Sequence, residues 1–518
     1  MARTNRTQWA QLFELPEHAA LSLQARLRLA IVQAVMDGRL SPGAALPSSR
    51  ELARLLGLGR NTVTAAYEQL VDEQFLEARP RSGVFVHGRA RAVAALEPPQ
   101  AGRAPGERSD ASDRAGRAPS WPTRVLRSLA DQPTLSKPQR WRDYPFPFVY
   151  GQFDPELFPT EDFRACCVGS LARSQLKHWT PDFDNDDVPE LIEQIRLRLL
   201  PKRGVFALAE EILITVGAQH SYHLLAEALF DGTTRVGLEE PGHPHARNTF
   251  SLRAPRFVPI DVDEQGLVVD TMPPVDYLFV TPSHQSPTTA TLSLERRQWL
   301  LKRAELHDFV VIEDDYEAEN LYEGSPMPAL KSLDKSGRVI YIGSISKSLS
   351  PALRLGYIVA PRALIAELRR LRHAMVRHPS TFLQQAYALF LSLGHHESHA
   401  RRVNNAMQER LAAVAQALRL DLPDFEFRVP QGGASVWVRA PAWVDASELG
   451  LIARRHGVLI EAGEVFFVQP PYPCPYFRLR LSSIQAAQIP AGIRALALAV
   501  AELATARGEP RAPLPRPH

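Results

Sequence analysis

A long segment poor in apolar residues divides this chain of 518 residues into two parts. From Gly88 to Trp141 the sequence is rich in Ala, Pro, Gly, Arg and Ser, as in GRARAVAALEPPQAGRAPGERSDASDRAGRAPSW. A segment of this composition buries too little apolar surface to offset the entropy that folding removes, so a flexible linker is favoured over a small, poorly patterned domain. Each flanking part must therefore fold around a core of its own.

Composition limits the class of protein. An apolar content of 45% supports large cores, no run of eighteen apolar residues occurs, and the first residues, MARTNRTQWAQLF, lack the pattern of a signal peptide. We therefore expect a cytoplasmic protein with no membrane partner. The three cysteines, Cys166, Cys167 and Cys474, have the spacing of neither a disulfide framework nor a metal site.

Charge is distributed unevenly along the chain. The formal net charge is +3, but Lys and Arg clearly outnumber Asp and Glu in residues 1–140 and fall below them in the rest. A basic N-terminal part is typical of a module that binds nucleic acid.

Residues 1–87 show the spacing of short amphipathic helices. In LSLQARLRLAIVQAVMDGRLSPG, apolar residues recur at helical intervals before a Gly/Pro turn, at Leu27, Ala30, Ile31, Ala34 and Val35. SSRELARLLGL predicts a second helix capped by Ser48 or Ser49, and NTVTAAYEQLVDEQF a third after a tight glycine turn. Two β-rich pieces then flank a basic turn at residues 79–83. This order predicts a helix-turn-helix with a wing, although a plain helical bundle shares the periodicity.

The stretch LPSSRELARLLGLGRNTVTAAYEQLVDEQFLEARPRSGVFV resembles the winged helix-turn-helix of the GntR family of bacterial regulators. The resemblance implies a double-stranded DNA operator as partner. The implied contact residues are Arg50, Arg60, Asn61, Thr62 and Gly83. Arginines and helix N-terminal amides bind phosphates, and arginine also reads guanine in the major groove. Gly59 departs from the family, in which a residue with a hydroxyl group is usual.

After the linker, strands alternate with helices, which predicts an α/β domain. EILITVGAQHSYHLLAEALF runs from an apolar strand through Gly217 into a helix, a junction whose backbone amides suit a phosphate. VDYLFVTPSHQSPTT, FVVIEDDYEAENLY and RVIYIGSISKSLS each end an apolar strand in polar residues, where α/β sheets carry their ligand sites. Lys347 in the last of these would by itself be a surface charge. Its neighbours, however, are the groups that a Schiff base with pyridoxal phosphate requires.

These segments resemble the fold type I aminotransferases, and specifically the aminotransferase-like half of the MocR regulators, which a GntR-type winged helix precedes. The resemblance implies pyridoxal 5′-phosphate as cofactor and Lys347 as its Schiff-base lysine. It implies that Asp314 pairs with the pyridine nitrogen and Tyr316 with the phenolic oxygen. The residues implied for the phosphate are Ser344, Arg354 and, through their amides, Ala218 and Gln219.

Other positions depart from the aminotransferase pattern. His243 stands where the ring that stacks on the cofactor is commonly tyrosine, and His245 where some relatives have a second substrate arginine. Ser286 stands for the asparagine that bonds the phenolic oxygen. Arg478 resembles the arginine that binds an α-carboxylate, and Arg480 could serve instead. These changes weigh against efficient transamination.

His395 and His399 in GHHESHA are four residues apart, as metal ligands on a helix can be. The Glu between them is not placed as in a zinc-protease helix, and no third ligand is evident. We therefore expect a solvated helix start and no metal site.

The two resemblances together predict a multidomain chain. An α+β winged helix-turn-helix and a flexible linker precede an α/β PLP-dependent transferase domain of fold type I, a smaller C-terminal α+β subdomain and a disordered tail. The expected boundaries are 1–87, 88–141, 142–375, 376–506 and 507–518. The resemblance also implies a homodimer that exchanges its winged helices head to tail.

The function predicted from these features is transcription regulation, with an amino acid or amine sensed as it forms an external aldimine with the cofactor on Lys347. An active aminotransferase with an accessory DNA-binding domain is the alternative, and keto-acid production would distinguish it. A regulator that reports only the abundance of the cofactor is a third possibility.

Overall fold

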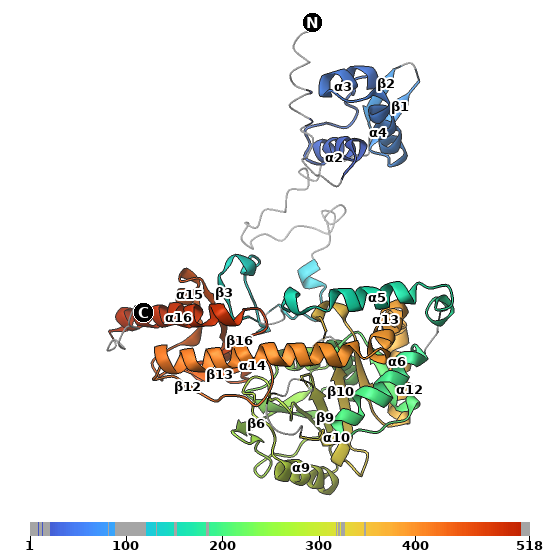
Figure 1. The fold of residues 1–518 in the computed structure, drawn as a ribbon. Helices are drawn as coiled ribbons and strands as arrows, with labels where there is room; N and C mark the ends of the chain where they lie inside the picture. The colour runs from blue at the N-terminus through green and yellow to red at the C-terminus, as the bar shows by residue number, and fades with distance from the viewer. Residues whose placement is uncertain are drawn as a thin grey trace, which may run out of the picture. The chain divides into compact units, whose positions relative to one another are not determined.

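The computed structural model divides the chain into two compact units, Met1–Ser120 and Trp121–His518 (Figure 1). It describes Trp9, Phe13 and residues 21–80, 82–88, 121–130, 132–149, 153–182, 186–317, 319, 322, 327–345 and 349–508. Residues 89–120 of the expected linker and 509–518 of the expected tail lie outside this described part. The second unit begins within the segment expected to be linker, and Asn248 Nδ2 donates a hydrogen bond to the carbonyl oxygen of Pro133 at 2.8 Å.

The first unit is a winged helix-turn-helix, which confirms the predicted fold. Its elements are α2 (Leu23–Met36), α3 (Ser49–Leu56), α4 (Arg60–Asp72), β1 (Leu76–Arg79) and β2 (Gly83–Val86). Ser48 caps α3 by accepting from the backbone N–H of Glu51, and Gly57 ends that helix at a φ of 65°. The N-cap of α4, Gly59, offers no side-chain hydrogen bond. The apolar face expected for the first helix is buried in the core of this unit.

An eight-stranded sheet forms the centre of the second unit (Figure 1). The strands lie in the order β4 (Ile212–Thr215), β11 (Gly356–Val359), β10 (Val339–Ser344), β9 (Val310–Asp315), β8 (Tyr277–Val280), β5 (Arg235–Glu240), β6 (Arg256–Asp263) and β7 (Gly266–Leu267). From β10 to β6 the neighbours are parallel, whereas β11 is antiparallel to both of its neighbours. Helices pack on both faces of the sheet, and the central strands β9 and β10 accordingly carry the apolar runs VVI and VIYI.

Three cores attach helices to this sheet. The core on one face includes α5 (Thr160–Ser170), α6 (Pro189–Gln194) and α13 (Thr381–Ser392). The core on the other face includes α7 (Ala218–Leu229), α8 (Pro244–Ser251) and α12 (Arg362–Val376). A third core includes α9 (Leu294–His307) and α10 (Leu330–Leu333). Because α13 belongs to the first of these cores, the large domain continues beyond its expected end at residue 375.

The smaller subdomain packs a four-stranded sheet against three helices. The sheet has the order β12 (Glu426–Phe427), β13 (Ser435–Arg439), β16 (Tyr476–Arg480) and β15 (Glu461–Ala462). The helices are α14 (His395–Asp421), α15 (Ala446–Arg455) and α16 (Ile489–Arg507). β3 (Phe146–Pro147) pairs with β14 (Val458–Leu459), and Phe148 is buried in this core, so residues 146–148 pack with the small subdomain.

Within the described residues, one segment, Ala486–Arg507, is long and apolar enough to cross a membrane by length and composition. It contains α16, and 50% of its apolar window is buried inside the protein. The buried residues of α16, among them Leu496, Val500 and Leu503, contribute to the core of the small subdomain, so the apolar character is that of a core helix.

Candidate functional site

The N-terminus of α7 follows directly on β4 and forms a cradle for an anion. Gly217 is the N-cap at a φ of 75°, and no side chain caps the amides of Ala218 and Gln219 in the first turn. The guanidinium of Arg354 lies across this turn. A Cβ on Gly217 would stand 3.2 Å from Arg354 Nη2, which donates to the carbonyl oxygen of Val216 at 3.2 Å. The guanidinium and the helix amides thus lie close together, which is the arrangement of an anion-binding site.

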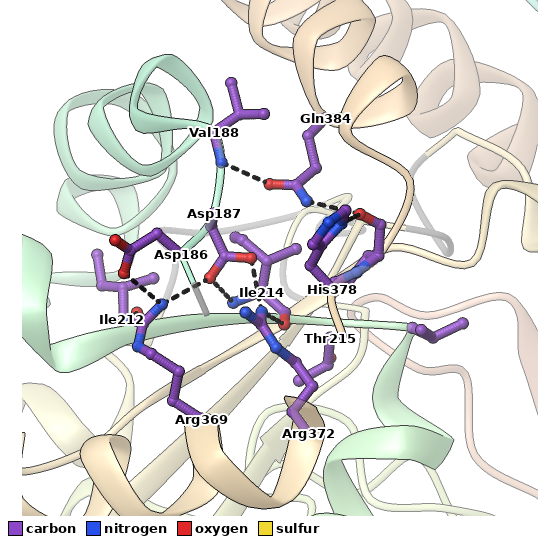
Figure 2. Close-up of polar contacts among 12 residues, drawn as sticks. Asp186, Asp187, Val188, Ile212, Ile214, Thr215, Arg369, Arg372, His378 and Gln384 are labelled. Atoms are coloured by element: carbon purple, nitrogen blue, oxygen red, sulfur yellow. Dashed lines mark hydrogen bonds and ion pairs between the residues drawn. The ribbon is translucent and has the colours of Figure 1, made fainter. Parts of the chain in front are cut away.

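Side chains rather than another strand cover the free edge of β4 (Figure 2). The carboxylate of Asp187 accepts from the backbone N–H of Ile214 at 3.2 Å and from Arg372 Nη1 at 2.6 Å. Arg372 Nη1 also donates to the carbonyl oxygen of Ile214 at 2.6 Å, and Arg369 Nη2 to that of Ile212 at 3.3 Å. These contacts hold the backbone of the strand that leads into the cradle.

Asp314 lies near the carboxyl end of β9 and is buried, with 1% of its surface exposed. Tyr222 in α7 donates its hydroxyl hydrogen to Asp314 Oδ2. The ring of Tyr222 packs edge-on against Phe250 and Phe279, at centroid distances of 6.0 and 5.5 Å. Tyr222 was not among the predicted site residues, although it lies four residues after Ala218 and hence on the same face of the helix.

The ring of His243 lies between that of Tyr222 and two further rings. The ring of His243 lies 6.1 Å from that of Tyr222, 5.6 Å from that of His245 and 6.4 Å from that of Tyr316, between centroids. His243 also caps α8, because its Nδ1 accepts from the backbone N–H of Ala246 at 3.2 Å, which places the proton of the neutral ring on Nε2. Burial raises the pKa of the Tyr316 hydroxyl above its ordinary value, so the hydroxyl keeps its proton.

Ser286 is buried in the turn after β8, where its backbone N–H donates to Thr281 Oγ1 at 3.0 Å. Glu239 in β5 holds this turn by accepting from the Thr281 hydroxyl and from Gln285 Nε2, at 2.6 and 3.2 Å. Burial raises the pKa of Glu239 to about 7, against the opposite effect of these hydrogen bonds. Glu239 was not predicted, because its contacts come from a different strand.

Arg478 and Arg480 lie two residues apart on β16, on the face opposite the core of the small subdomain, and both are buried. Arg478 Nε donates to Glu461 Oε2 at 2.7 Å, and Arg480 Nη2 donates to Glu317 Oε1. Glu317 directly follows Tyr316, so the second ion pair joins the small subdomain to the segment after β9. Neither carboxylate partner was predicted.

The segment after β9 is also attached to α14. His396 in the first turn of α14 is buried and bonds Glu319 Oε1 through Nε2 and the Tyr387 hydroxyl through Nδ1, the latter at 2.8 Å. His399 is buried as well, with its ring 6.0 Å from that of Phe153, so the expectation of a solvated helix start is wrong for this residue. In the described part of the chain no cluster of His, Cys, Asp or Glu could hold a metal ion.

Lys347 falls in residues 346–348, which lie outside the described residues. Ser344, the last residue of β10, is half-buried. Because β9 and β10 are parallel neighbours, Ser344 lies at the same edge of the sheet as Asp314. Asp314 and Ser344, both predicted to bind the cofactor, thus lie at the carboxyl edge of the sheet.

In the first unit, the expected DNA contacts lie on three elements. Arg50 is in the first turn of α3 and is exposed. α4 begins with Arg60, Asn61 and Thr62, of which the first two are exposed and the third is half-buried. Gly83 begins β2 at a φ of 111°, with nothing within 4 Å of a Cβ built there. The start of α4 and the wing are thus open to a partner.

Two family models match the chain. Residues 23–86 match the bacterial regulatory proteins of the gntR family, and residues 183–496 match the class I and II aminotransferases. The HTH-type transcriptional regulator TauR of Rhodobacter capsulatus is 40% identical over 92% of this chain and 96% of its own length. The chain belongs to the MocR-type GntR regulators. It is therefore a DNA-binding transcription regulator with an aminotransferase-like domain.

Further relatives agree with this membership. The probable rhizopine catabolism regulatory protein MocR of Rhizobium meliloti is 33% identical over 76% of this MocR-type chain and 76% of its own. Among solved structures, LysN, an alpha-aminoadipate aminotransferase from Thermus thermophilus, is similar with a TM-score of 0.65 and 27% identity, covering 70% of this chain and 93% of that one. The similarity confirms the predicted fold type I aminotransferase architecture of the second unit.

Proposed function

We propose that this MocR-type regulator binds pyridoxal 5′-phosphate at the carboxyl edge of its large sheet and responds there to an amino acid or amine. The observation that carries the proposal is a convergence of groups from separate elements. The cradle of Gly217 and Arg354, the buried Asp314 and the ring of His243 are linked through Tyr222, which bonds Asp314 and packs beside His243.

The donor set fits this cofactor. A phosphate is an anion that a guanidinium and helix N-terminal amides bind together, as the cradle provides. A buried carboxylate such as Asp314 holds a proton on a pyridine nitrogen, and the hydroxyl of Tyr222 fixes the orientation of that carboxylate. When bound, the cofactor supplies an aldehyde carbon that condenses with primary amines.

The remaining roles are those that the resemblance to the fold type I aminotransferases implies. Lys347 is the lysine that holds the cofactor covalently. The phosphate is assigned to Ser344, Arg354, Ala218 and Gln219. Tyr316 and Ser286 are assigned to the phenolic oxygen, His243 to stacking on the ring, and Arg478 and His245 to the effector. The protonated hydroxyl of Tyr316 suits a hydrogen bond to an anionic oxygen.

DNA binding is assigned to α4 and the wing, through Arg50, Arg60, Asn61, Thr62 and Gly83. Two copies of the chain that exchange winged helices head to tail would present two recognition helices to two half-sites of one operator. Such a protein works in the cytoplasm, where its operator is. Sedimentation velocity of the full-length protein tests the dimer.

The effector proposal is tested by the visible absorption spectrum of full-length protein loaded with pyridoxal phosphate. The protein is titrated with a panel of amines and amino acids, and keto acids are assayed afterwards. A stable shift with one compound, no keto acid and an altered affinity for DNA support a sensor. A shift that decays with release of keto acid would show an active aminotransferase instead. DNA binding that depends on the cofactor but on no amine would contradict effector sensing.

A further inference from the structure

The two buried arginines of β16 meet their carboxylate partners in different ways. Glu461 accepts from Nε of Arg478, the guanidinium nitrogen nearest the aliphatic stem. The guanidinium carbon of Arg478 also lies 4.6 Å from the ring centre of Phe466, which packs one face of the group. A bidentate grip on an acid group uses two guanidinium nitrogens at once, and the proposed function assigns this role to Arg478.

Glu317 instead meets Arg480 at a terminal nitrogen, Nη2. Its other oxygen, Oε2, accepts from the backbone N–H of Ala434 at 3.1 Å, and a Cβ on Gly433 would stand 3.0 Å from it. The two side chains are 6% and 2% exposed. Burial, the largest single influence, acts to lower the pKa of Arg480, but the charge and hydrogen bond of Glu317 and the charges of Tyr316 and Glu461 together raise it, so the guanidinium stays charged.

Arg480 lies close to the proposed effector site. Arg478 and Arg480 project from the same face of β16, with Cα atoms about 7 Å apart. The charges of both arginines act on the hydroxyl of Tyr316, the residue before Glu317. Among the residues that the structure describes, the buried Arg480 Nε has no hydrogen-bond partner, so Glu317 does not satisfy every donor of this guanidinium.

We propose that Glu317 masks Arg480 and thereby restricts the effector to compounds with a single acidic group, which Arg478 binds. This inference rests on the proposed function, because it names the class of amino compound that the same site accepts. A second acidic group beside Arg480 would face the buried carboxylate of Glu317. Like charges at close range in a buried site repel strongly, so an effector with two acidic groups is disfavoured.

Two probes separate this selectivity from the reaction of an amine with the cofactor. Propionate and succinate differ by one carboxylate, and neither carries an amine. Isothermal titration calorimetry on full-length protein loaded with pyridoxal phosphate gives a Kd for each acid. The proteins compared are the wild type, Glu317→Gln, Glu317→Asp and the double variant Glu317→Gln/Arg480→Gln. Glutamine removes the charge at nearly constant shape, and aspartate shortens the reach of the carboxylate if the glutamine variant fails to fold.

We expect the wild type to bind propionate more tightly than succinate. Glu317→Gln should raise the affinity for succinate relative to propionate by about tenfold or more, because a buried guanidinium without its partner takes up the second carboxylate. Glu317→Asp should shift the ratio in the same direction by a smaller factor. The double variant, in which both charges are gone, should return the ratio toward the wild-type value.

One result overturns the masking role. In it, propionate binds the wild type and not Arg478→Gln, but neither Glu317→Gln nor Glu317→Asp changes the ratio of the Kd for succinate to the Kd for propionate. The masking role is also overturned if the wild type binds neither acid. Titration of the same protein with L-alanine, followed by its visible spectrum, then decides whether the proposed function fails too. A spectral shift with the amine leaves effector sensing intact and rejects only the acid selectivity.

Discussion

Lys347 is the side chain on which the proposed cofactor chemistry depends. We expect Lys347→Ala to abolish the visible absorption that pyridoxal phosphate gives the full-length protein, because the covalent bond to the cofactor needs this amine. The winged helix, as a separate compact unit, should keep its fold and its affinity for DNA without effector. Lys335→Ala, at an exposed lysine, is the control and should keep the absorption. Full absorption in the Lys347 variant would reject the assignment.

His220 in the first turn of α7 makes the cradle sensitive to acid. Its Nδ1 accepts from the backbone N–H of Val216 at 3.0 Å. Burial, followed by the charges of Arg372, His223 and Arg354, lowers the pKa of His220 from 6.5 to about 4. Between pH 6.5 and pH 4, His220 is protonated in the unfolded chain but not in the folded chain. The free energy of unfolding therefore falls as the pH drops from 6.5 toward 4.

We expect His220→Asn to reduce this loss of stability at pH 5 by about 1 to 2 kcal/mol, because the asparagine oxygen accepts the same hydrogen bond without titrating. Urea unfolding of both proteins at pH 7 and pH 5 measures the difference. His307→Asn, at an exposed histidine, should behave as the wild type. Equal acid losses in the wild type and His220→Asn would contradict the prediction.

Individual site residues were predictable from the sequence where they lie at the end of a strand or at the start of a helix. Asp314 and Ser344 lie at the carboxyl ends of neighbouring parallel strands. The carboxyl ends of parallel strands lie at one edge of a sheet, so this local pattern predicts that the two residues are close together. Glu317 and Glu461 were not predictable as partners of arginines, because each ion pair joins segments far apart along the chain. Tyr222 was predictable in principle, because it lies four residues after Ala218 and therefore on the same face of the helix.

The edge strand β4 depends on the side chains beside it. We expect Asp187→Asn to lower the free energy of unfolding of the second unit by about 3 kcal/mol, because it leaves the buried Arg372 without its charged partner. Binding of pyridoxal phosphate should weaken too, since β4 leads directly to Gly217. Urea unfolding and titration with the cofactor measure the two effects.

Asp182→Asn is the matched control for this prediction. The carboxylate of Asp182 pairs with Arg377 at the surface, with side chains 51% and 61% exposed. An exposed ion pair contributes about 0.5 kcal/mol, so this variant should unfold nearly as the wild type does. A loss in Asp187→Asn no larger than in Asp182→Asn would show that the edge of β4 does not need the buried pair.

Helices and strands were predictable where their apolar spacing is local. The three helices of the first unit and the alternating strands and helices of the second follow their expected periods. The pairing of β3 with β14, and the packing of α13 on the large sheet, were not expected. These placements depend on which distant surfaces the chain brings together, and short apolar stretches do not encode that choice locally.

The proposed effector sensing implies that DNA binding and amine binding are linked reciprocally. If the amine changes the affinity of the protein for DNA by some factor, DNA must change the affinity of the protein for the amine by the same factor. Fluorescence anisotropy of a duplex selected in vitro gives the affinity for DNA with and without the amine. The visible spectrum gives the affinity for the amine with and without DNA, at the same salt concentration. We expect the two affinities to change by the same factor. Arg60→Ala, which weakens the DNA contact, should remove the effect of DNA on the amine titration. Unequal factors would reject a single coupled equilibrium.

The first turn of α14 contains His396, which is bonded to Glu319 in the segment after β9, and the C-terminal part of α14 contains Leu418, in the core of the small subdomain. A helix of 27 residues is about 40 Å long. If a helix of this length turns as a rigid rod about its first turn, a tilt of about 5° displaces its last turn by about 3.5 Å. We expect a small shift of the Glu319 carboxylate to be passed in this way to the far end of the small subdomain, because His396 is bonded to that carboxylate.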